Sequence, residues 1–284
     1  MPSPPVAPPA APSAPLVDTH VHLTDRRYAG DLDAVLARAR EAGVRAMVVV
    51  GYDLPSSREA VGLASRYPEL WAAVGIHPHG ARNASPAALA DLESLAESPK
   101  VVAIGECGLD FYRDLSPRDA QREAFLAQLY LAQRRRLPVV VHSREAMPLT
   151  LELLMKQALL DGGVMHCFDG TTDDGQRAID LGLYLSCAGP LTYRRDPTLA
   201  QALAAAPLER LVVETDCPYL SPHGHRGERN EPAHVREVAA ALARTRGLRL
   251  TEVAAATTAN AARLFCTPAL ATAADGRVAA GHAS

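Results

Sequence analysis

Eight short apolar runs, rich in valine, isoleucine and leucine, recur along the chain without regular polar alternation. A half-exposed strand alternates apolar and polar residues, whereas a strand covered on both faces is nearly continuously apolar. The pattern therefore predicts buried strands of a parallel sheet. They are expected at Leu16–Leu23, Arg45–Tyr52, Trp71–Pro78, Val101–Leu109, Pro138–His142, Val164–Phe168, Leu183–Cys187 and Leu211–Thr215.

Helical patterns lie between these runs. Ser85 and Ser116 each precede a proline, which is typical of an N-cap followed by the first helical residue, and Gly43 and Gly182 mark expected helix ends. Strands that alternate with helices predict an α/β fold, a (β/α)8 TIM barrel, with an open doubly wound sheet as the alternative. Helices are expected at Leu32–Ala42, Pro86–Glu97, Pro117–Arg136, Ala146–Leu160, about Ala233–Arg246 and about Thr251–Phe265.

The length of 284 residues suits one such barrel, which typically needs about 250. We expect a single domain at 16–266, with a disordered Pro/Ala-rich tail at 1–15 and a flexible tail at 267–284. The first tail lacks the basic and apolar regions of a secretory signal, and no run is long enough to span a membrane.

Polar side chains that can bind a metal end five of the apolar runs. They are His20, His22, Glu106, His142, His166 and Asp216. Because all strand C-termini of a β/α barrel meet at one rim, these distant residues are expected to converge in one cup. A histidine at a strand end is often only structural, and Glu106 could instead pair with an arginine, but five such coincidences favour a metal site.

The residue types suggest separate roles. His20 and His22 are two residues apart on an expected strand, so their imidazoles lie on the same face and can reach one ion. Glu106 could bridge two cations through its two oxygens, and Asp216 could combine metal binding with general-base catalysis. Glu214 shares the face of Asp216 and could orient neighbouring ligands, unless it forms only a buried ion pair.

The predicted ligands divide into two sets that share Glu106. One set holds His20, His22 and Asp216, and the other holds His142 and His166. We therefore expect two divalent ions, which in such sites lie about 3.5–4 Å apart. Mixed nitrogen and oxygen ligands admit Mg, Mn or Zn. Asp18 could accept a hydrogen bond behind these ligands.

Further residues on the same rim could hold a substrate. They are His77 and His79 after the third run, Arg113 and Arg144 after the fourth and fifth, and Tyr219 and Arg226 after the eighth, with Glu214 deeper in the site. Arginines could grip phosphate and aromatic rings could stack on bases. A solvated charged loop or ordinary packing is the alternative for each.

The net charge and the cysteine content indicate how a substrate could be held and in which compartment the protein works. A formal net charge of −3 gives no broad positive field for nucleic acid or membrane, so a phosphate-bearing substrate must be held by local cations. The five cysteines, an odd number, do not indicate a disulfide framework and favour a reducing, cytoplasmic location. Strand alternation predicts that Cys107, Cys167 and Cys217 face the helices.

The chain resembles the TatD family of metal-dependent deoxyribonucleases, in the amidohydrolase superfamily. The stretches that carry this resemblance are DTHVHL, GIHPH, GECGLDFYR, HSREA, HCFDG, ETDCPYL and RGERNEP, in family order from about Val17 to Pro232. The resemblance implies the same barrel, the same six ligands and DNA hydrolysis, often from the 3′ end. Many related binuclear enzymes use a bridging carboxylated lysine, but neither Lys100 nor Lys156 can take that place.

The sequence thus predicts a hydrolase that cleaves DNA phosphodiesters at strand ends with a metal-activated water. We expect it to act as a monomer, with Asp216 and Glu106 as catalytic residues. The alternative is hydrolysis of carboxylic esters or amides on the same site, as in an aminoacyl-tRNA deacylase, a lactonase or a dihydroorotase-like enzyme. A non-catalytic metal-stabilised scaffold is a third hypothesis.

Overall fold

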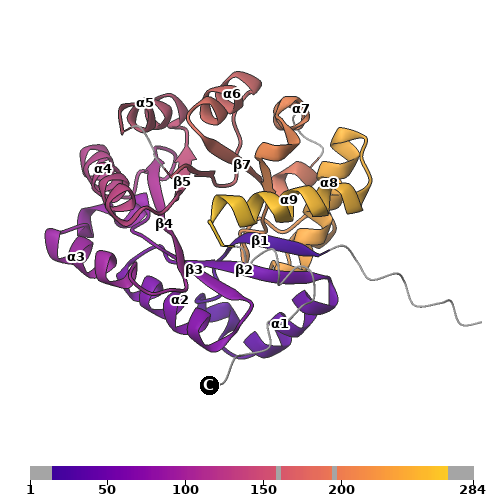
Figure 1. Ribbon diagram of the computed structural model, residues 1–284, viewed down its shortest axis with the longest axis horizontal. Helices are drawn as coiled ribbons and strands as arrows, with labels where there is room; N and C mark the ends of the chain where they lie inside the picture. Colours follow the sequence, from indigo (N-terminus) through magenta and orange to yellow (C-terminus); the bar gives the residue numbers. More distant parts are fainter. Residues whose placement is uncertain (1–14, 158–160, 194–196, 268–284) are drawn as a thin grey trace, which may run out of the picture.

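The computed structural model describes residues 15–157, 161–193 and 197–267. Its single sheet has eight parallel strands in sequence order, drawn in Figure 1. Parallel bonding between Val21 of the first strand and Cys217, beyond the last, closes the sheet into a barrel. The strands are β1 (Leu16–Val21), β2 (Val44–Val50), β3 (Leu70–Val74), β4 (Val101–Asp110), β5 (Val139–Arg144), β6 (Gly163–Met165), β7 (Leu183–Cys187) and β8 (Leu211–Val213).

Helices form the outer layer around the barrel (Figure 1). The sequential strand order shows a (β/α)8 barrel and excludes the doubly wound alternative, in which the order reverses. The α-helices are α1 (Leu32–Glu41), α2 (Leu54–Arg66), α3 (Pro86–Leu95), α4 (Arg118–Arg135), α5 (Met147–Gln157), α6 (Thr172–Asp180), α7 (Pro197–Ala205), α8 (Val235–Arg246) and α9 (Leu250–Leu264).

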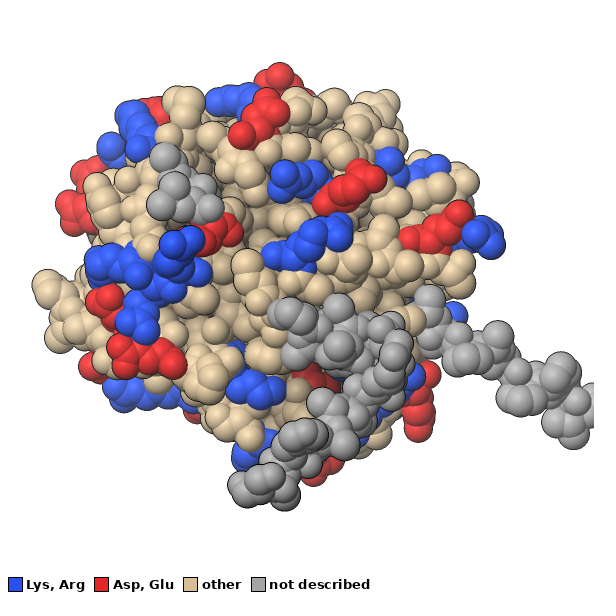
Figure 2. Space-filling view, viewed as in Figure 1, with Lys and Arg blue, Asp and Glu red and all other residues tan. Residues whose placement is uncertain are grey.

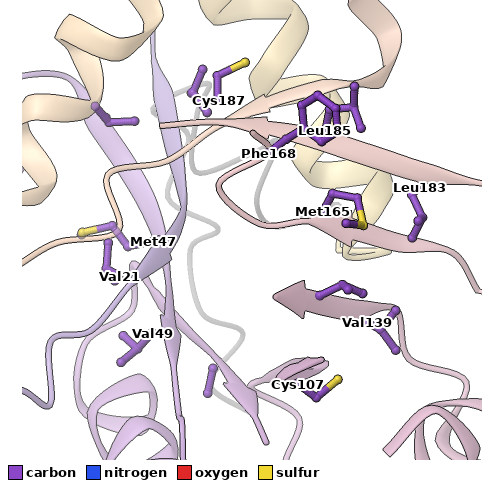
Figure 3. Close-up of a cluster of buried hydrophobic side chains, with 14 of the residues drawn as sticks. Val21, Met47, Val49, Cys107, Val139, Met165, Phe168, Leu183, Leu185 and Cys187 are labelled. Carbon is purple, nitrogen blue, oxygen red and sulfur yellow. The ribbon is translucent and has the colours of Figure 1, made fainter. Parts of the chain in front are cut away.

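Two apolar layers fill the molecule. The larger layer lies between the barrel and its helices, and Figure 3 shows Cys107 and Cys187 among its side chains. The smaller layer fills the barrel interior, where strand residues meet Leu264 and Phe265 at the end of α9. This helix therefore plugs the N-terminal end of the barrel, which leaves the C-terminal end for polar side chains.

The predicted elements are present, with shifted ends. Gly43 and Gly182 follow helices at φ 92° and 87°, a conformation that favours glycine. Ser85 caps α3 as predicted. Ser116 does not cap α4, because Pro117 takes the N-cap position and the Ser116 hydroxyl donates instead to the His79 carbonyl.

The predicted tails at 1–15 and 267–284 fall, except for Pro15 and Thr267, outside the described residues. Figure 2 shows acidic and basic side chains interspersed over the face in view, without a broad patch of one sign. Every helix in the described ranges lacks the combination of length and apolar character needed to cross a membrane.

Candidate metal centre

The six predicted ligands all stand at the C-terminal end of the barrel. His20, Glu106 and His142 lie within β1, β4 and β5. His22 and His166 directly follow β1 and β6, and Asp216 is the third residue after β8. Five of the six are buried, and His142 is partly buried. Gly105 permits this placement next to Glu106: its φ is 139°, and an added Cβ would lie 2.4 Å from the Val140 carbonyl oxygen.

The carboxylate of Glu106 faces two groups of histidines through its two oxygens. Oε2 lies 3.4 Å from His20 Nε2 and 3.8 Å from His22 Nε2. Oε1 lies 2.8 Å from His142 Nδ1, 3.6 Å from His166 Nε2 and 3.5 Å from His77 Nε2. The two oxygens thus face different groups of histidines, which is the arrangement that a bridging carboxylate requires.

Asp216 completes the side of the cup next to β1. Its Oδ1 lies 3.3 Å from His22 Nε2, 3.8 Å from His20 Nε2 and 3.9 Å from His166 Nε2. His166 stacks on His20 with ring centroids 3.6 Å apart. His166 therefore contacts both predicted ligand sets rather than the His142 set alone.

His77 and Asp110 extend the site on its β4 and β5 side. His77, predicted as a substrate contact, groups with Glu106 and His142 as possible ligands of one ion. Sequence reasoning missed Asp110, which ends β4 and lies 2.8 Å from His79 Nε2 and 3.4 Å from His142 Nε2. The signal was available, because GLD ends the same buried run that holds Glu106.

The histidines and carboxylates of the cup shift one another's pKa values. Burial opposes the charge on Glu106, but His77 and His166 hold its pKa well below the usual range. Burial lowers the pKa of His20 and of His77, which favours the neutral imidazole that binds metals. Burial opposes charge on His166 as well, yet Glu214 and Glu106 raise its pKa to about 10.

The donor set fits divalent cations. The ion-pair partners found for Glu106 and Asp216 are all histidines. His20 Nε2 and His22 Nε2, two lone-pair donors when unprotonated, lie only 3.2 Å apart. The buried His142 Nε2 has no hydrogen bond of good geometry among the described residues, although Asp110 Oδ2 lies 3.4 Å away. Buried carboxylates and imidazoles that face one another in this way are costly without a cation between them.

A second layer of polar residues supports the cup. Glu214 Oε1 lies 2.8 Å from His166 Nδ1 and accepts a hydrogen bond from the Cys167 backbone N–H. Asp18 accepts hydrogen bonds behind the ligands, as expected, but from backbone and hydroxyl donors. It accepts hydrogen bonds from the Thr215 hydroxyl and from the Thr215 and His20 backbone N–H groups.

The cysteine prediction is correct at two positions and wrong at the third. Cys107 and Cys217 belong to the layer between barrel and helices. Cys167 does not, because β6 ends at Met165 and strand alternation no longer applies two residues later. Its φ of 43° turns the chain, and burial together with Glu214 raises its pKa well above the usual value.

The remaining predicted substrate contacts surround the cup at different distances. Tyr219 meets His22 edge-on, with ring centroids 5.9 Å apart. The guanidiniums of Arg144 and Arg113 lie 3.9 and 5.9 Å from the ring of Tyr112. Arg226 instead stacks on Tyr193, 4.5 Å from its ring.

Tyr193 also lines a cavity of about 380 Å³ between α8 and the loops after β7 and β8. None of the six candidate ligands lines this cavity. The structure thus brings Arg144 and Tyr219 to the mouth of the cup, and associates Arg226 with a neighbouring part of the surface.

Comparison with known proteins adds a family to this geometry. A family model described as TatD related DNase matches residues 17–266. The protein named uncharacterized metal-dependent hydrolase YabD, from Bacillus subtilis, is 40% identical over 251 residues, which cover 88% of this chain and 98% of that protein. The 3′-5′ ssDNA/RNA exonuclease TatD of Klebsiella pneumoniae is 41% identical over 256 residues, or 88% of this chain and 97% of that protein.

Solved structures give the same result. The TatD homologue YjjV of Escherichia coli superimposes with a TM-score of 0.86 at 33% identity, covering 89% of this chain and 98% of that one. A TatD family hydrolase of Entamoeba histolytica gives a TM-score of 0.80 at 25% identity, covering 89% and 99%. The likeness therefore includes the whole barrel and not only the motifs around the cup.

Proposed function

The chain belongs to the family of TatD related DNases, and from this premise we propose that it is a metal-dependent exonuclease. It hydrolyses phosphodiester bonds of single-stranded DNA, from the 3′ end toward the 5′ end. The observation that carries the proposal is the position of Glu106, whose two oxygens face separate groups of histidines. Such a carboxylate suits a pair of divalent ions, the arrangement used to cleave phosphate esters.

The cup offers donors for two ions. His20 and His22 face one oxygen of Glu106 and also face Asp216. The other oxygen of Glu106 faces His142, His166 and His77. Divalent ions held there would polarise the phosphate and make water a better nucleophile at neutral pH. Mg, Mn and Zn are all compatible with these donors.

The protein's own groups move the proton and set the geometry. Burial opposes ionisation of Asp216, but His22 and His166 lower its pKa, so it is a carboxylate that can accept a proton from the attacking water. The water oxygen bonds to phosphorus and the bond from phosphorus to the 3′ oxygen breaks. The 3′ oxygen then takes up one proton from solvent, balancing the proton that Asp216 receives. The products are a nucleoside 5′-monophosphate and a strand shortened by one residue.

The proposed function also bears on the substrate, the oligomeric state and the location of the protein. The partner is a nucleic acid strand end, and the relatives named ssDNA/RNA exonucleases make RNA a second substrate to test. A monomer suffices, because one chain supplies every candidate ligand. Cytoplasmic location stays a prediction from the reduced cysteines.

The test is a strand-shortening assay on the metal-stripped protein reloaded with Mg, Mn or Zn. We expect 5′-labelled single-stranded DNA to shorten stepwise, with mononucleotide release and about two ions per chain by elemental analysis. The Glu106→Gln protein, checked by circular dichroism, is the folded control. Faster turnover of aminoacyl-tRNA, lactones or dihydroorotate than of DNA would replace the nuclease proposal with the ester or amide hydrolase.

A further inference from the structure

Three exposed tyrosines surround the mouth of the buried cup. Tyr52, Tyr112 and Tyr219 follow β2, β4 and β8, and they are 40%, 54% and 47% exposed. Tyr130, 54% exposed on α4, lies instead in the outer helix layer. Exposed rings at a phosphate-cleaving centre offer stacking surfaces for bases, which bind aromatic side chains without strong sequence preference.

Two of these rings flank the β1 side of the cup. Tyr52 and Tyr219 both meet His22 edge-on, with ring centroids 5.8 and 5.9 Å from that of His22. The guanidinium of Arg27 lies 4.5 Å from the Tyr219 ring. Asp25 neutralises this guanidinium through an ion pair of 2.8 Å. This platform therefore offers aromatic surface and little net charge.

The third ring stands on the opposite side. In the eight-strand order, β4 and β5 lie across the barrel from β1. The guanidinium of Arg144, at the end of β5, lies 3.9 Å from the Tyr112 ring and is exposed. Within the described ranges no carboxylate comes within ion-pair distance of it, and Asp169 interacts with it only at longer range. This platform keeps its positive charge.

We propose that the two platforms hold the two nucleotides on either side of the scissile phosphate. Tyr52 and Tyr219 take the base of the departing 3′-terminal nucleotide, and Tyr112 with Arg144 takes the strand that remains. The inference rests on the proposed nuclease function and assigns its substrate contacts.

The charges decide which platform receives which nucleotide. Beyond the scissile phosphate, the 3′-terminal nucleoside has no further phosphate, so the neutralised Arg27 side suits it. The retained strand continues with one negative charge per residue, which favours the uncompensated guanidinium of Arg144. Chain direction across the cup thus follows from the asymmetry between two arginines.

The first test measures the KM of each tyrosine variant on substrates that carry a non-aromatic base at one chosen position. 5,6-Dihydrothymine keeps the hydrogen-bonding edge of thymine but loses its flat aromatic face. We expect this base at the terminal position to raise the KM of the wild-type enzyme by about 5- to 140-fold, the range that stacking on one base provides. For the Tyr219→Ala protein, replacing the terminal thymine with dihydrothymine should change the KM little. For the Tyr112→Ala protein, the same change of base should still raise the KM.

At the penultimate position the pattern reverses, with Tyr112→Ala insensitive and Tyr219→Ala sensitive. Tyr219→Phe and Tyr112→Phe restore the KM, because stacking needs the ring and not the hydroxyl. Tyr130→Ala is the matched control, with equal exposure to Tyr112 and wild-type kinetics expected. A reversed pairing of variants and positions overturns the assignment, and equal sensitivity of all variants overturns the platforms.

The second test measures binding alone. Fluorescence anisotropy with the Glu106→Gln protein compares a labelled hexathymidylate with a labelled dithymidylate, which has only one phosphate. We expect Arg144→Gln to weaken hexamer binding at least fivefold more than dimer binding and to reduce the salt slope for the hexamer by about 0.7. Arg27→Gln should weaken both oligonucleotides equally. If Arg144→Gln affects the two lengths alike, the strand does not lie on that side.

These tests separate the inference from the proposed function. If the enzyme shortens DNA but the variants do not show the expected KM pattern on the dihydrothymine substrates, the proposed nuclease function stands and the proposed platforms are wrong. A metal-loaded wild-type enzyme that does not cleave DNA loses the proposed function, whatever the anisotropy shows.

Discussion

The two ends of this barrel are built from the same strands but filled with opposite chemistry. At the N-terminal end, Leu264 and Phe265 at the end of α9 seal an apolar interior. At the C-terminal end, Glu106 and Asp216 share a buried cup with histidines. Burial stabilises the first arrangement, whereas without cations the second is costly. The comparison suggests that fold stability resides at the plugged end and that function is maintained at the expense of stability at the other.

Glu106→Gln should have the largest effect. The amide keeps the size of the side chain but removes the charge that faces both histidine groups, so we expect at least about a thousandfold loss in kcat for DNA cleavage. Bound metal should fall from about two ions per chain to one or none. Metal content by elemental analysis and single-turnover kinetics measure the two effects. Full metal loading with full activity would show that the bridge is not Glu106.

The metal-free Glu106→Gln protein sharpens the comparison further. If the cup is costly when no cation is bound, this variant should be at least as stable to urea as the metal-free wild type. Adding Mn should stabilise only the wild type, because ligands that bind the native state raise its stability. A clear loss of stability in the metal-free variant would mean that the cup supports the fold as well as the chemistry.

Leu264→Ala tests the plugged end. Removing a buried leucine should lower the free energy of unfolding by about 2–5 kcal/mol, as in other apolar cores. Metal content and KM should stay unchanged below the melting range. Leu115→Ala, the same substitution at a 53% exposed position, is the control and should cost about 0.5 kcal/mol or less. Loss of metal from Leu264→Ala at temperatures where it is folded would argue against independent ends.

Glu214→Gln should have an intermediate effect. Its carboxylate lies 2.8 Å from His166 Nδ1. The amide oxygen can still accept a hydrogen bond there but lacks the negative charge that strengthens it, so this imidazole is held and polarised less strongly. Carboxylates behind metal-bound histidines typically contribute about 10- to 100-fold in metal affinity. Competition with a chelating dye measures that affinity directly. Unchanged metal affinity with lower activity would place Glu214 in contact with the substrate instead.

The sequence predicted the barrel and the cup better than it predicted contacts within the cup. Strand ends fix which rim a residue occupies, so six residues from five strands could be grouped without coordinates. The partners of His166, which contacts both sets, depend on the turn at Cys167, where φ is 43°. Asp110 was missed because its role depends on His79, from the segment after β3, and on His142, from β5. Such contacts depend on side-chain directions that strand periodicity does not specify.

Lys100 offers the smallest and most specific test of the two ends. It belongs to the plugged end: its ammonium donates to the Pro68 and Leu70 carbonyls and lies 4.3 Å from the Trp71 ring. Lys100→Met should therefore cost about 1 kcal/mol of stability, from lost hydrogen bonds and cation–π contact. Metal content and kcat should match the wild type, because Lys100 precedes β4 whereas Glu106 lies in the second half of that strand. A loss of metal in this variant would require that the chain use Lys100 in a conformation different from this one.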